Sequence, residues 1–279
     1  MTEKLHTYQV IQTASGQTGY VTLGQGPALI LLVGYSGNLL HWNSELIYAL
    51  AEKFTLYLPD NRLVGESYSN NSESMEGFAA DCIDFIQALE LNKPLICGWS
   101  MGGIIAQALA SQNIDLIGGL IFIVSQPDYS FTLGRLHQLV SDLREKPNKE
   151  NRERLTEVFF SKIPSLELRK YLAKAILPIK HYVYPFNDKA QTLQDSAVAN
   201  WRSDHTKLGQ INLPTLITVA KNDWVTKPSA SWILHDLIPN SKLISYPDGG
   251  HFFLHYYPKQ LAQEICQFFL GKINVETQA

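Results

Sequence analysis

One serine lies where its type and its neighbours suit nucleophilic chemistry. The pentapeptide Gly98-Trp99-Ser100-Met101-Gly102 has the spacing G-x-S-x-G, and it follows an apolar run and begins a helix-forming one. In a sharp strand-to-helix turn the serine hydroxyl projects above the sheet, and flanking glycines leave room around it. The backbone N–H of Met101 would then lie at a helix N-terminus, where it can stabilise an oxyanion. The alternative interpretation is a glycine-rich turn with an incidental serine.

A base and a carboxylate that could activate this serine lie downstream. A serine hydroxyl is a weak nucleophile until a base takes its proton and a carboxylate orients that base. Asp223 follows the apolar run at 214–220, and His251 follows the run at 241–247 and two glycines. Loops at the carboxyl ends of parallel strands meet at one edge of a sheet. We therefore expect Ser100, Asp223 and His251 to converge there, in a chain order known for such sheets.

The segments that would position these residues alternate between two kinds of pattern. Short apolar runs predict buried parallel strands at 28–34, 54–60, 93–98, 116–124, 214–220 and 241–247, after a hairpin at 8–23. Apolar residues spaced near 3.6 predict helices at 46–53, 75–91, 100–112, 227–238 and 256–271, the last ending at Gly271. This alternation predicts an α/β fold with a mostly parallel central sheet and helices on both faces.

The alternation is interrupted between about residues 127 and 206. This stretch has no strand-like run, and helical spacing recurs at 133–146, 153–162 and 165–176. We therefore expect residues 1–126 and 207–279 to form the core and residues 127–206 to form an inserted helical cap.

Taken together, these motifs make the chain similar to the α/β-hydrolase superfamily over nearly its whole length. The similarity rests on "GWSMGG", "VAKNDWVTKP" and "DGGHFF", together with "LLVGYSGNLLHW" and "PDNRLVGES". The resemblance implies a serine carboxylesterase-like protein with an α/β-hydrolase fold and a helical cap. It also implies Ser100 as nucleophile, His251 as general base and Asp223 as the orienting acid. The backbone N–H groups of Tyr35 and Met101 would form the oxyanion hole.

Two residues depart from the pattern of that superfamily. Val33 stands where a histidine usually precedes Gly34, so the loop loses side-chain support while the next backbone donor remains. Leu63 stands where glycine is common, and it would be strained if the backbone there has a positive φ. Asp60 and Arg62, in the same motif, are expected to brace the loops near the site rather than to take part in catalysis.

Three further residues are weighed as rivals of the catalytic set. Asp128 follows the sixth predicted strand, counting the two strands of the hairpin, where some hydrolases of this fold keep their acid, but a turn role after a proline is favoured. Asp248 is close to His251 in sequence, and we expect it to cap its own turn. His255 lies four residues after His251, a spacing typical of metal ligands on a helix. No HExxH motif completes such a set, so no metal site is predicted.

Aromatic residues gather near the same loops and suggest an apolar substrate pocket. The candidates for substrate binding are Trp99, Tyr129, Phe131, Trp201 and Phe252. Core packing is the alternative explanation for several of these rings. A mainly apolar pocket with few polar groups is also what an acyl or alkyl ester needs.

The composition sets limits on the protein class. The 279 residues are 45% hydrophobic and 18% charged, with a net charge of −3, so nothing indicates a nucleic-acid or anionic-membrane partner. Cys82, Cys97 and Cys266 form no CxxC pair and are expected to be reduced thiols. No signal-peptide-like or membrane-spanning run is recognised, and we expect a cytoplasmic protein without a cofactor.

The predicted function is that of a serine hydrolase that cleaves an ester or thioester through an acyl-enzyme. The alternatives are acyl transfer by the same three residues, a ligand-sensing module of this fold, and an esterase acting on an acyl-carrier methyl ester. The last would dock an acidic acyl carrier protein on the arginines of the cap, whose usual role is a solvated surface. These are Arg135, Arg144, Arg152, Arg154 and Arg169.

Overall fold

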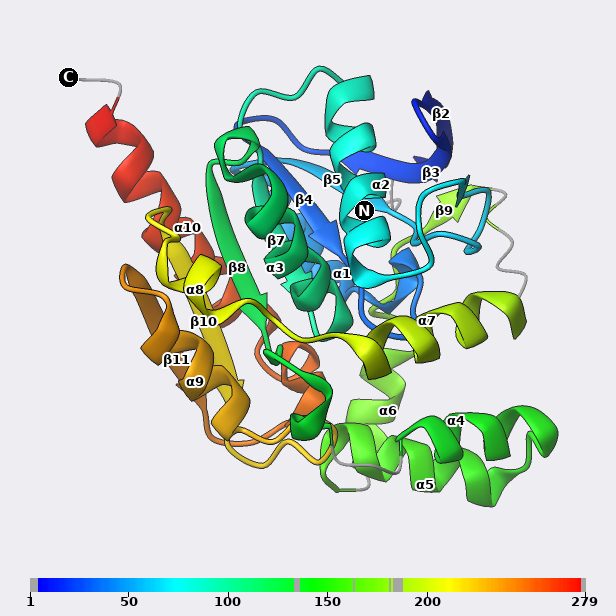
Figure 1. Cartoon of the computed structure of the whole chain (residues 1–279). Helices are drawn as coiled ribbons and strands as arrows, with labels where there is room; N and C mark the ends of the chain where they lie inside the picture. The colour runs from blue at the N-terminus through cyan, green and yellow to red at the C-terminus, as the bar shows by residue number, and fades with distance from the viewer. Residues whose placement is uncertain (1–4, 133–135, 163, 181, 183–187, 277–279) are drawn as a thin grey trace.

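A central sheet organises the chain. The computed structural model describes residues 5–132, 136–162, 164–180, 182 and 188–276 (Figure 1). Within these residues the sheet order is β11 (Ser241–Tyr246), β10 (Thr215–Ala220), β8 (Gly119–Ile123), β7 (Leu95–Trp99), β4 (Ala28–Leu32), β5 (Thr55–Pro59), β3 (Gly16–Leu23) and β2 (Gln9–Thr13). The short strand β6 (Tyr68–Ser69) pairs with β3. The neighbours from β5 to β11 pair in parallel, whereas β3 is antiparallel to its partners. The predicted hairpin and mostly parallel sheet are confirmed.

The middle strands are apolar because both faces of the sheet are covered. Every residue of β7, β8 and β10 is buried, so these strands carry continuous apolar runs instead of an alternating pattern. Their carboxyl ends point to one edge of the sheet, because they are parallel. The loops that follow β7 and β10 therefore open onto a shared edge.

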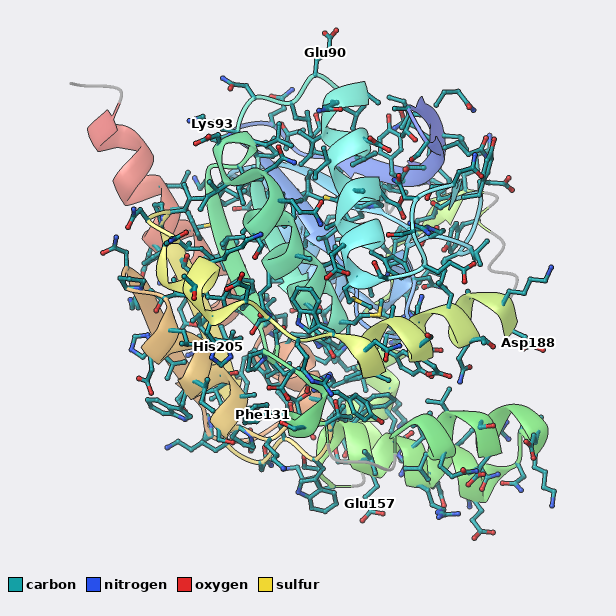
Figure 2. All side chains as sticks on the ribbon, in the orientation of Figure 1. Glu90, Lys93, Phe131, Glu157, Asp188 and His205 are labelled. Atoms are coloured by element: carbon teal, nitrogen blue, oxygen red, sulfur yellow. The ribbon has the colours of Figure 1, made fainter. Side chains whose placement is uncertain are left out.

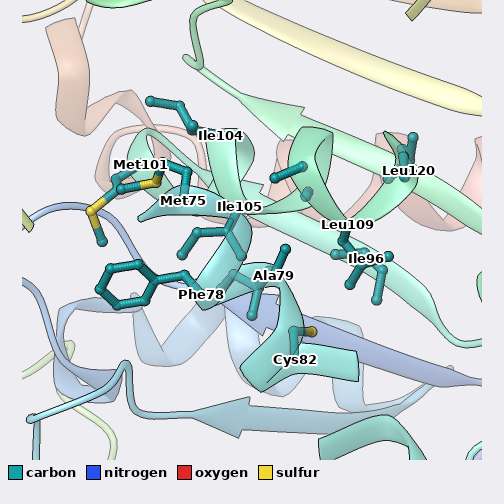
Figure 3. Packing of buried hydrophobic residues seen from close by; sticks show 14 of the residues in the cluster. Met75, Phe78, Ala79, Cys82, Ile96, Met101, Ile104, Ile105, Leu109 and Leu120 are labelled. Carbon is teal, nitrogen blue, oxygen red and sulfur yellow. The ribbon is translucent and has the colours of Figure 1, made fainter. Parts of the chain in front are cut away.

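Helices form a layer on each face of the sheet. One face is covered by α2 (Met75–Ala88), α3 (Met101–Asn113), α8 (His205–Gly209) and α9 (Ser229–Leu237), and the other by α1 (Ser44–Ala51) and α10 (Pro258–Glu276). In Figure 3, Phe78 and Ala79 of α2 lie next to Ile105 of α3, and these residues belong to one buried cluster. The two layers fix α3, and with it the turn at Ser100, against the sheet.

The cap segment (residues 127–206) is mainly helical in its described part. It contains η3 (Tyr129–Phe131), α4 (Leu136–Glu145), α5 (Lys149–Phe160), α6 (Leu166–Leu172), β9 (Ile179–Lys180) and α7 (Asp188–Asn200). Figure 1 shows α4 and α5 together at the lower right, with α7 between them and the core. The strand β9 pairs in parallel with β1 (His6–Thr7) in a separate small sheet.

Two helices differ from the sequence prediction. Helix α7 was not predicted, because its sequence is mostly polar and only two of its buried residues, Leu193 and Val198, are large and apolar. Helix α10 continues to Glu276 and does not end at Gly271. No atom lies within 4 Å of the position that a side chain at Gly271 would take, so no packing or turn ends the helix there. A helical glycine costs only about 1 kcal/mol relative to alanine, and the preceding turns are anchored by the buried Ile265 and Phe269.

No described helix has the length and the apolar character needed to cross a membrane.

Candidate active site

Ser100 lies in a strained turn between β7 and α3. Its backbone has φ 55° and ψ −117°, a conformation that side-chain-bearing residues rarely adopt. The Ser100 N–H donates to the Ile123 carbonyl at 2.8 Å, and the Ser100 carbonyl accepts from Gly103 N at 2.9 Å and Ser125 Oγ at 3.0 Å. These bonds hold the strained conformation, so the side chain has a fixed direction at the edge of the sheet.

Glycines around Ser100 allow close contact between backbone segments. A Cβ at Gly98 would lie 2.2 Å from the Gly102 carbonyl oxygen, and a Cβ at Gly102 would lie 2.0 Å from the Leu32 oxygen. Larger residues would push α3 away from β4 and β7. Met101 is the first residue of α3, so its N–H has no acceptor within the helix.

Asp223 and His251 form a buried hydrogen-bonded pair. The distance from His251 Nδ1 to Asp223 Oδ2 is 2.7 Å, and both residues are buried. The other carboxylate oxygen, Oδ1, accepts from the backbone N–H groups of Val225 at 2.7 Å and Thr226 at 3.0 Å. These donors fix the carboxylate, which in turn fixes the imidazole and leaves Nε2 for another partner.

The loop that carries His251 depends on two glycines with positive φ. Gly249 and Gly250 have φ values of 92° and 59°, and Gly250 N donates to Asn222 Oδ1 at 3.1 Å. The Trp99 Nε1–H donates to the His251 carbonyl at 3.2 Å. The residue before Ser100 is therefore bonded directly to the backbone of His251, which joins the two loops.

A cavity of about 250 Å³ brings Ser100 and His251 to one surface. The cap segment contributes Val140, Leu143, Leu155 and Phe159 to its walls, and the core contributes the 33–37 loop, His41, Trp99 and Phe252. Phe159 stacks on Phe252 with ring centroids 4.3 Å apart. Most of the wall is apolar, so the cavity favours an uncharged, apolar group next to the serine.

The two predicted oxyanion donors border Ser100. A Cβ at Gly34 would lie 3.2 Å from Ser100 Cβ, so the loop containing Tyr35 runs along the serine. Tyr35, Ser100 and Met101 also line a second, small cavity of about 20 Å³. Tyr35 and Met101, which come from two different segments, therefore border the same small space as Ser100.

The predicted pocket residues divide into two groups. Trp99 and Phe252 line the larger cavity, but Tyr129, Phe131 and Trp201 are not among its described lining residues. The substrate-binding role of these three residues stays a prediction. Trp201 is 5% exposed and packs in the core cluster of α3 and α7, and Tyr129 packs against the same cluster. Phe131 ends η3, where its carbonyl accepts from Lys227 N. The aliphatic Val140, Leu143 and Leu155 take the expected place, and no motif in the sequence distinguishes them from surface helix residues.

Comparison with known proteins identifies the family. A family model described as the alpha/beta hydrolase fold matches residues 27–258. The chain belongs to this family. It is 24% identical over 251 residues to a RutD protein of Agrobacterium fabrum, assigned as a carbamate hydrolase, covering 89% of this chain and 95% of the relative. It is 23% identical over 248 residues to the pimeloyl-[acyl-carrier protein] methyl ester esterase of Nitrosomonas europaea, covering 86% and 94%.

A solved structure supports the same fold assignment. The alpha/beta hydrolase fold protein from Chitinophaga pinensis superposes with a TM-score of 0.78 at 23% sequence identity. The match covers 93% of this chain and 96% of that protein. The α/β-hydrolase fold predicted from the sequence is confirmed.

The two departures from the family pattern have different consequences. Val33 is buried, and its Cγ2 lies 2.8 Å from where a Cβ at Gly37 would be, so it packs against the loop without offering a hydrogen bond. Leu63 has φ 63°, the left-handed conformation that glycine adopts without strain. Its N–H donates to the Ser67 carbonyl at 2.8 Å, which helps to hold the turn. Leu63 thus keeps the strained backbone.

Asp60 connects three parts of the fold. Its carboxylate accepts from Tyr8 Oη at 2.8 Å, Tyr182 Oη at 2.9 Å and Leu39 N at 3.2 Å. Arg62 does not bind Asp60 and instead pairs with Asp81 at 2.7 Å. The N-terminal segment, the cap segment and the helical turn that begins at Leu39 therefore meet at one buried carboxylate. No motif in the sequence pointed to the two tyrosines.

Burial makes Asp60 a source of pH-dependent stability. Desolvation raises the pKa of Asp60 from 3.8 to about 6, although its three donors act in the opposite direction. A group whose pKa is higher in the folded protein than in the unfolded protein stabilises the fold at a pH below its unfolded pKa. This stabilisation is lost as the pH rises through its folded pKa. Between about pH 4 and 7 we expect the free energy of unfolding of the wild type to fall by up to about 3 kcal/mol more than that of Asp60→Asn. Urea unfolding of both proteins across this range would measure the two free energies. If the difference between them did not change with pH, the prediction would be contradicted.

The rival residues have other partners. Asp128 accepts from Ser130 N at 2.8 Å and caps η3. Asp248 accepts from Tyr257 Oη and pairs with Lys162 at 3.7 Å. His255 lies near Asn43, with 3.3 Å between Nδ1 and Nδ2. Among the described residues no group of three or more His, Cys, Asp or Glu side chains is arranged to hold a metal ion.

Proposed function

We propose that the protein is a serine hydrolase that cleaves carboxylic esters with apolar acyl groups through an acyl-enzyme. The observation that carries the proposal is the buried 2.7 Å bond between His251 and Asp223 in a loop that shares a cavity with Ser100. A base oriented by a carboxylate, next to a serine in a strained turn, is the arrangement that activates a hydroxyl.

The proposed reaction uses each of these groups once per half-reaction. Ser100 Oγ attacks the ester carbonyl while His251 Nε2 takes its proton, and Asp223 holds the imidazolium that forms. The N–H groups of Tyr35 and Met101 stabilise the negative oxygen of the tetrahedral intermediate. His251 then gives the proton to the leaving alcohol. Water, activated by the same histidine, releases the acid and restores Ser100.

The walls of the cavity support an apolar acyl group. Val140, Leu143, Leu155 and Phe159 offer no charge. Desolvation lowers the pKa of the half-buried His41 below its ordinary value, which favours the neutral ring. Two relatives are named as a carbamate hydrolase and a methyl ester esterase, and both names describe cleavage of an acyl–oxygen or acyl–nitrogen bond. A thioester of similar shape would fit the same chemistry.

The alternative that the substrate is an ester bound to an acyl carrier protein has weaker support. The relative from Nitrosomonas europaea acts on a carrier-bound ester by its name. Arg135 lies outside the described residues, and the side chain of Arg144 is not described. On α5, however, Lys149, Arg152 and Arg154 are matched by Glu150, Glu153 and Glu157, and Figure 2 shows Glu157 pointing away from the molecule. The charges of α5 therefore cancel, and Arg169 of α6 pairs with Glu153 at 4.0 Å. We therefore propose a small-molecule ester.

Filling the cavity should shift the preference for acyl length. Leu155→Trp puts a large ring into the cavity wall. We therefore expect the ratio of kcat/KM for the octanoate to that for the acetate p-nitrophenyl ester to fall about 10-fold or more, since each excluded methylene loses about 0.8 kcal/mol of burial. Leu166→Trp is the matched control, because Leu166 is 61% exposed on α6 of the same segment. Equal ratios for Leu155→Trp and Leu166→Trp would place the acyl group elsewhere.

A further inference from the structure

The loop before η1 (Leu39–His41) contains a strained turn beside Ser100. Gly37 N donates to the Gly34 carbonyl at 3.2 Å, which closes a four-residue β-turn. Ser36, the third residue of the turn, has φ 56°, whereas Tyr35 is not among the residues with positive φ. This combination defines a type II turn, whose third position ordinarily requires glycine. A serine there favours the type I turn, in which its φ would be negative.

A side chain from the cap segment opposes that change. Gln194 Oε1 accepts from the Ser36 N–H at 2.7 Å. This N–H belongs to the central peptide of the turn, and rotation of that peptide is what converts type II into type I. Rotation of this peptide would break the hydrogen bond to Gln194 and leave the buried Oε1 without this donor, which costs free energy. Gln194 is 1% exposed, so water cannot take the place of Ser36.

Gln194 is held by a firmly docked helix. Leu193, Ala197 and Val198 of α7 are buried in the cluster that also contains Met101 of α3. Its neighbours thus belong to the buried core that also contains the first residue of α3, while Gln194 reaches the turn. Val33, the residue before the turn, places its apolar Cγ2 against Gly37. The position of the turn therefore depends on the docking of α7.

We propose that Gln194 is a positioning residue, which holds the 34–37 turn so that the Tyr35 N–H faces the developing oxyanion. The inference rests on the proposed function, because it assigns Gln194 to the oxyanion hole of that reaction. The Tyr35 N–H belongs to the first peptide of the turn, which meets the central peptide at the Tyr35 Cα. A change of turn type alters ψ of Tyr35 and φ of Ser36, so the bond from Ser36 to Gln194 holds the backbone that directly follows the donor. The cap segment then takes part in assembling the site as well as in enclosing the substrate.

The test removes the acceptor while keeping the shape of the side chain. Gln194→Met should lower kcat for p-nitrophenyl butanoate by about 10- to 100-fold with a smaller change in KM, because the oxyanion forms only in the reaction step. Gln194→Asn has a side chain shorter by one methylene, which moves the acceptor oxygen away from Ser36 N. This variant should also have a lower kcat, and it replaces the methionine variant in the test if that variant does not fold. An unchanged kcat in these variants would overturn the proposal.

A second substitution separates positioning from simple packing. Glycine adopts a positive φ without strain, so Ser36→Gly should restore most of the lost kcat in the Gln194→Met protein. Leu193→Ala is the control for loosened packing of α7, and Ser36→Gly should not restore any activity that it loses. Absence of rescue in the Gln194→Met protein, or equal rescue in the Leu193→Ala protein, would assign Gln194 a structural role only.

Failure of the proposed function would look different. If the protein were not a serine hydrolase, Ser100→Ala would hydrolyse the ester as fast as the wild type, whatever the result at Gln194. If only the inference about Gln194 were wrong, Ser100→Ala would be inactive while Gln194→Met kept the wild-type kcat.

Discussion

Ser100→Ala should lower kcat for p-nitrophenyl butanoate by about 10⁴-fold or more while the protein remains folded. Loss of the nucleophile of such a set leaves only the catalysis supplied by the oxyanion donors and by binding. The change removes one oxygen at the edge of the sheet, and alanine keeps the Cβ, so the backbone bonds of Ser100 to Ile123 and Gly103 can persist. Steady-state kinetics and urea unfolding of both proteins would measure the two effects separately.

Covalent labelling gives an independent readout of the same residue. A fluorophosphonate should label the wild type at Ser100 and leave Ser100→Ala unlabelled, because it reacts with an activated serine. Ser111→Ala is a suitable control, since Ser111 lies near the other end of α3 and its substitution should leave both labelling and turnover unchanged. Turnover by Ser100→Ala at the wild-type rate would refute the nucleophile assignment.

The central sheet and the turn at Ser100 could be predicted because their signals are local. Strands such as β7 and β8 are buried on both faces, so the chain has continuous apolar runs there. The glycines around Ser100 are required because neighbouring backbone segments leave no room for a Cβ. Such a requirement produces a motif that can be recognised in a short stretch of sequence. The order of the motifs then suggested which loops share an edge.

The cap segment was harder to predict because its partners are remote in sequence. Helix α7 contains few large apolar residues, and its buried residues join a core cluster whose other members lie far from it along the chain. Trp201 belongs to the same cluster, and its aromatic ring alone does not distinguish a core residue from a pocket residue. Leu155 and Phe159, which do face the cavity, have the same apolar spacing as any helix that packs on another.

Single hydrogen bonds between residues far apart along the chain could not be predicted from the sequence. The bonds of Asp60 to Tyr8 and Tyr182 join residues that no motif links. The bond from Ser36 to Gln194 is of the same kind, and it joins a loop of the core to a helix of the cap segment. Sequence reasoning identified Leu63 as a strained position only because glycine is usual there, and its φ of 63° agrees with that expectation.

Asp223→Asn should lower kcat by about 10⁴-fold, and Asp128→Asn by no more than a few-fold. An asparagine at position 223 can present an N–H to His251 Nδ1, which favours the imidazole tautomer that cannot accept a proton from the serine at Nε2. The oxygen of the introduced amide can still accept from Val225 N and Thr226 N, so the loop is expected to keep its conformation. Asp128 only caps η3, and asparagine is as good a cap as aspartate.

The comparison of these two variants tests which loop carries the acid, because both substitutions remove one charge and preserve size. If the loop after β8 supplied the acid, Asp128→Asn would be the slower enzyme, and the order of the reactive residues along the chain would change. The observed geometry favours the loop after β10, since Asp223 is buried and bonded to His251. Asp128 instead directs its carboxylate to Ser130 N of its own turn. A larger loss of kcat in Asp128→Asn would therefore refute the acid assignment even if Ser100 proved to be the nucleophile.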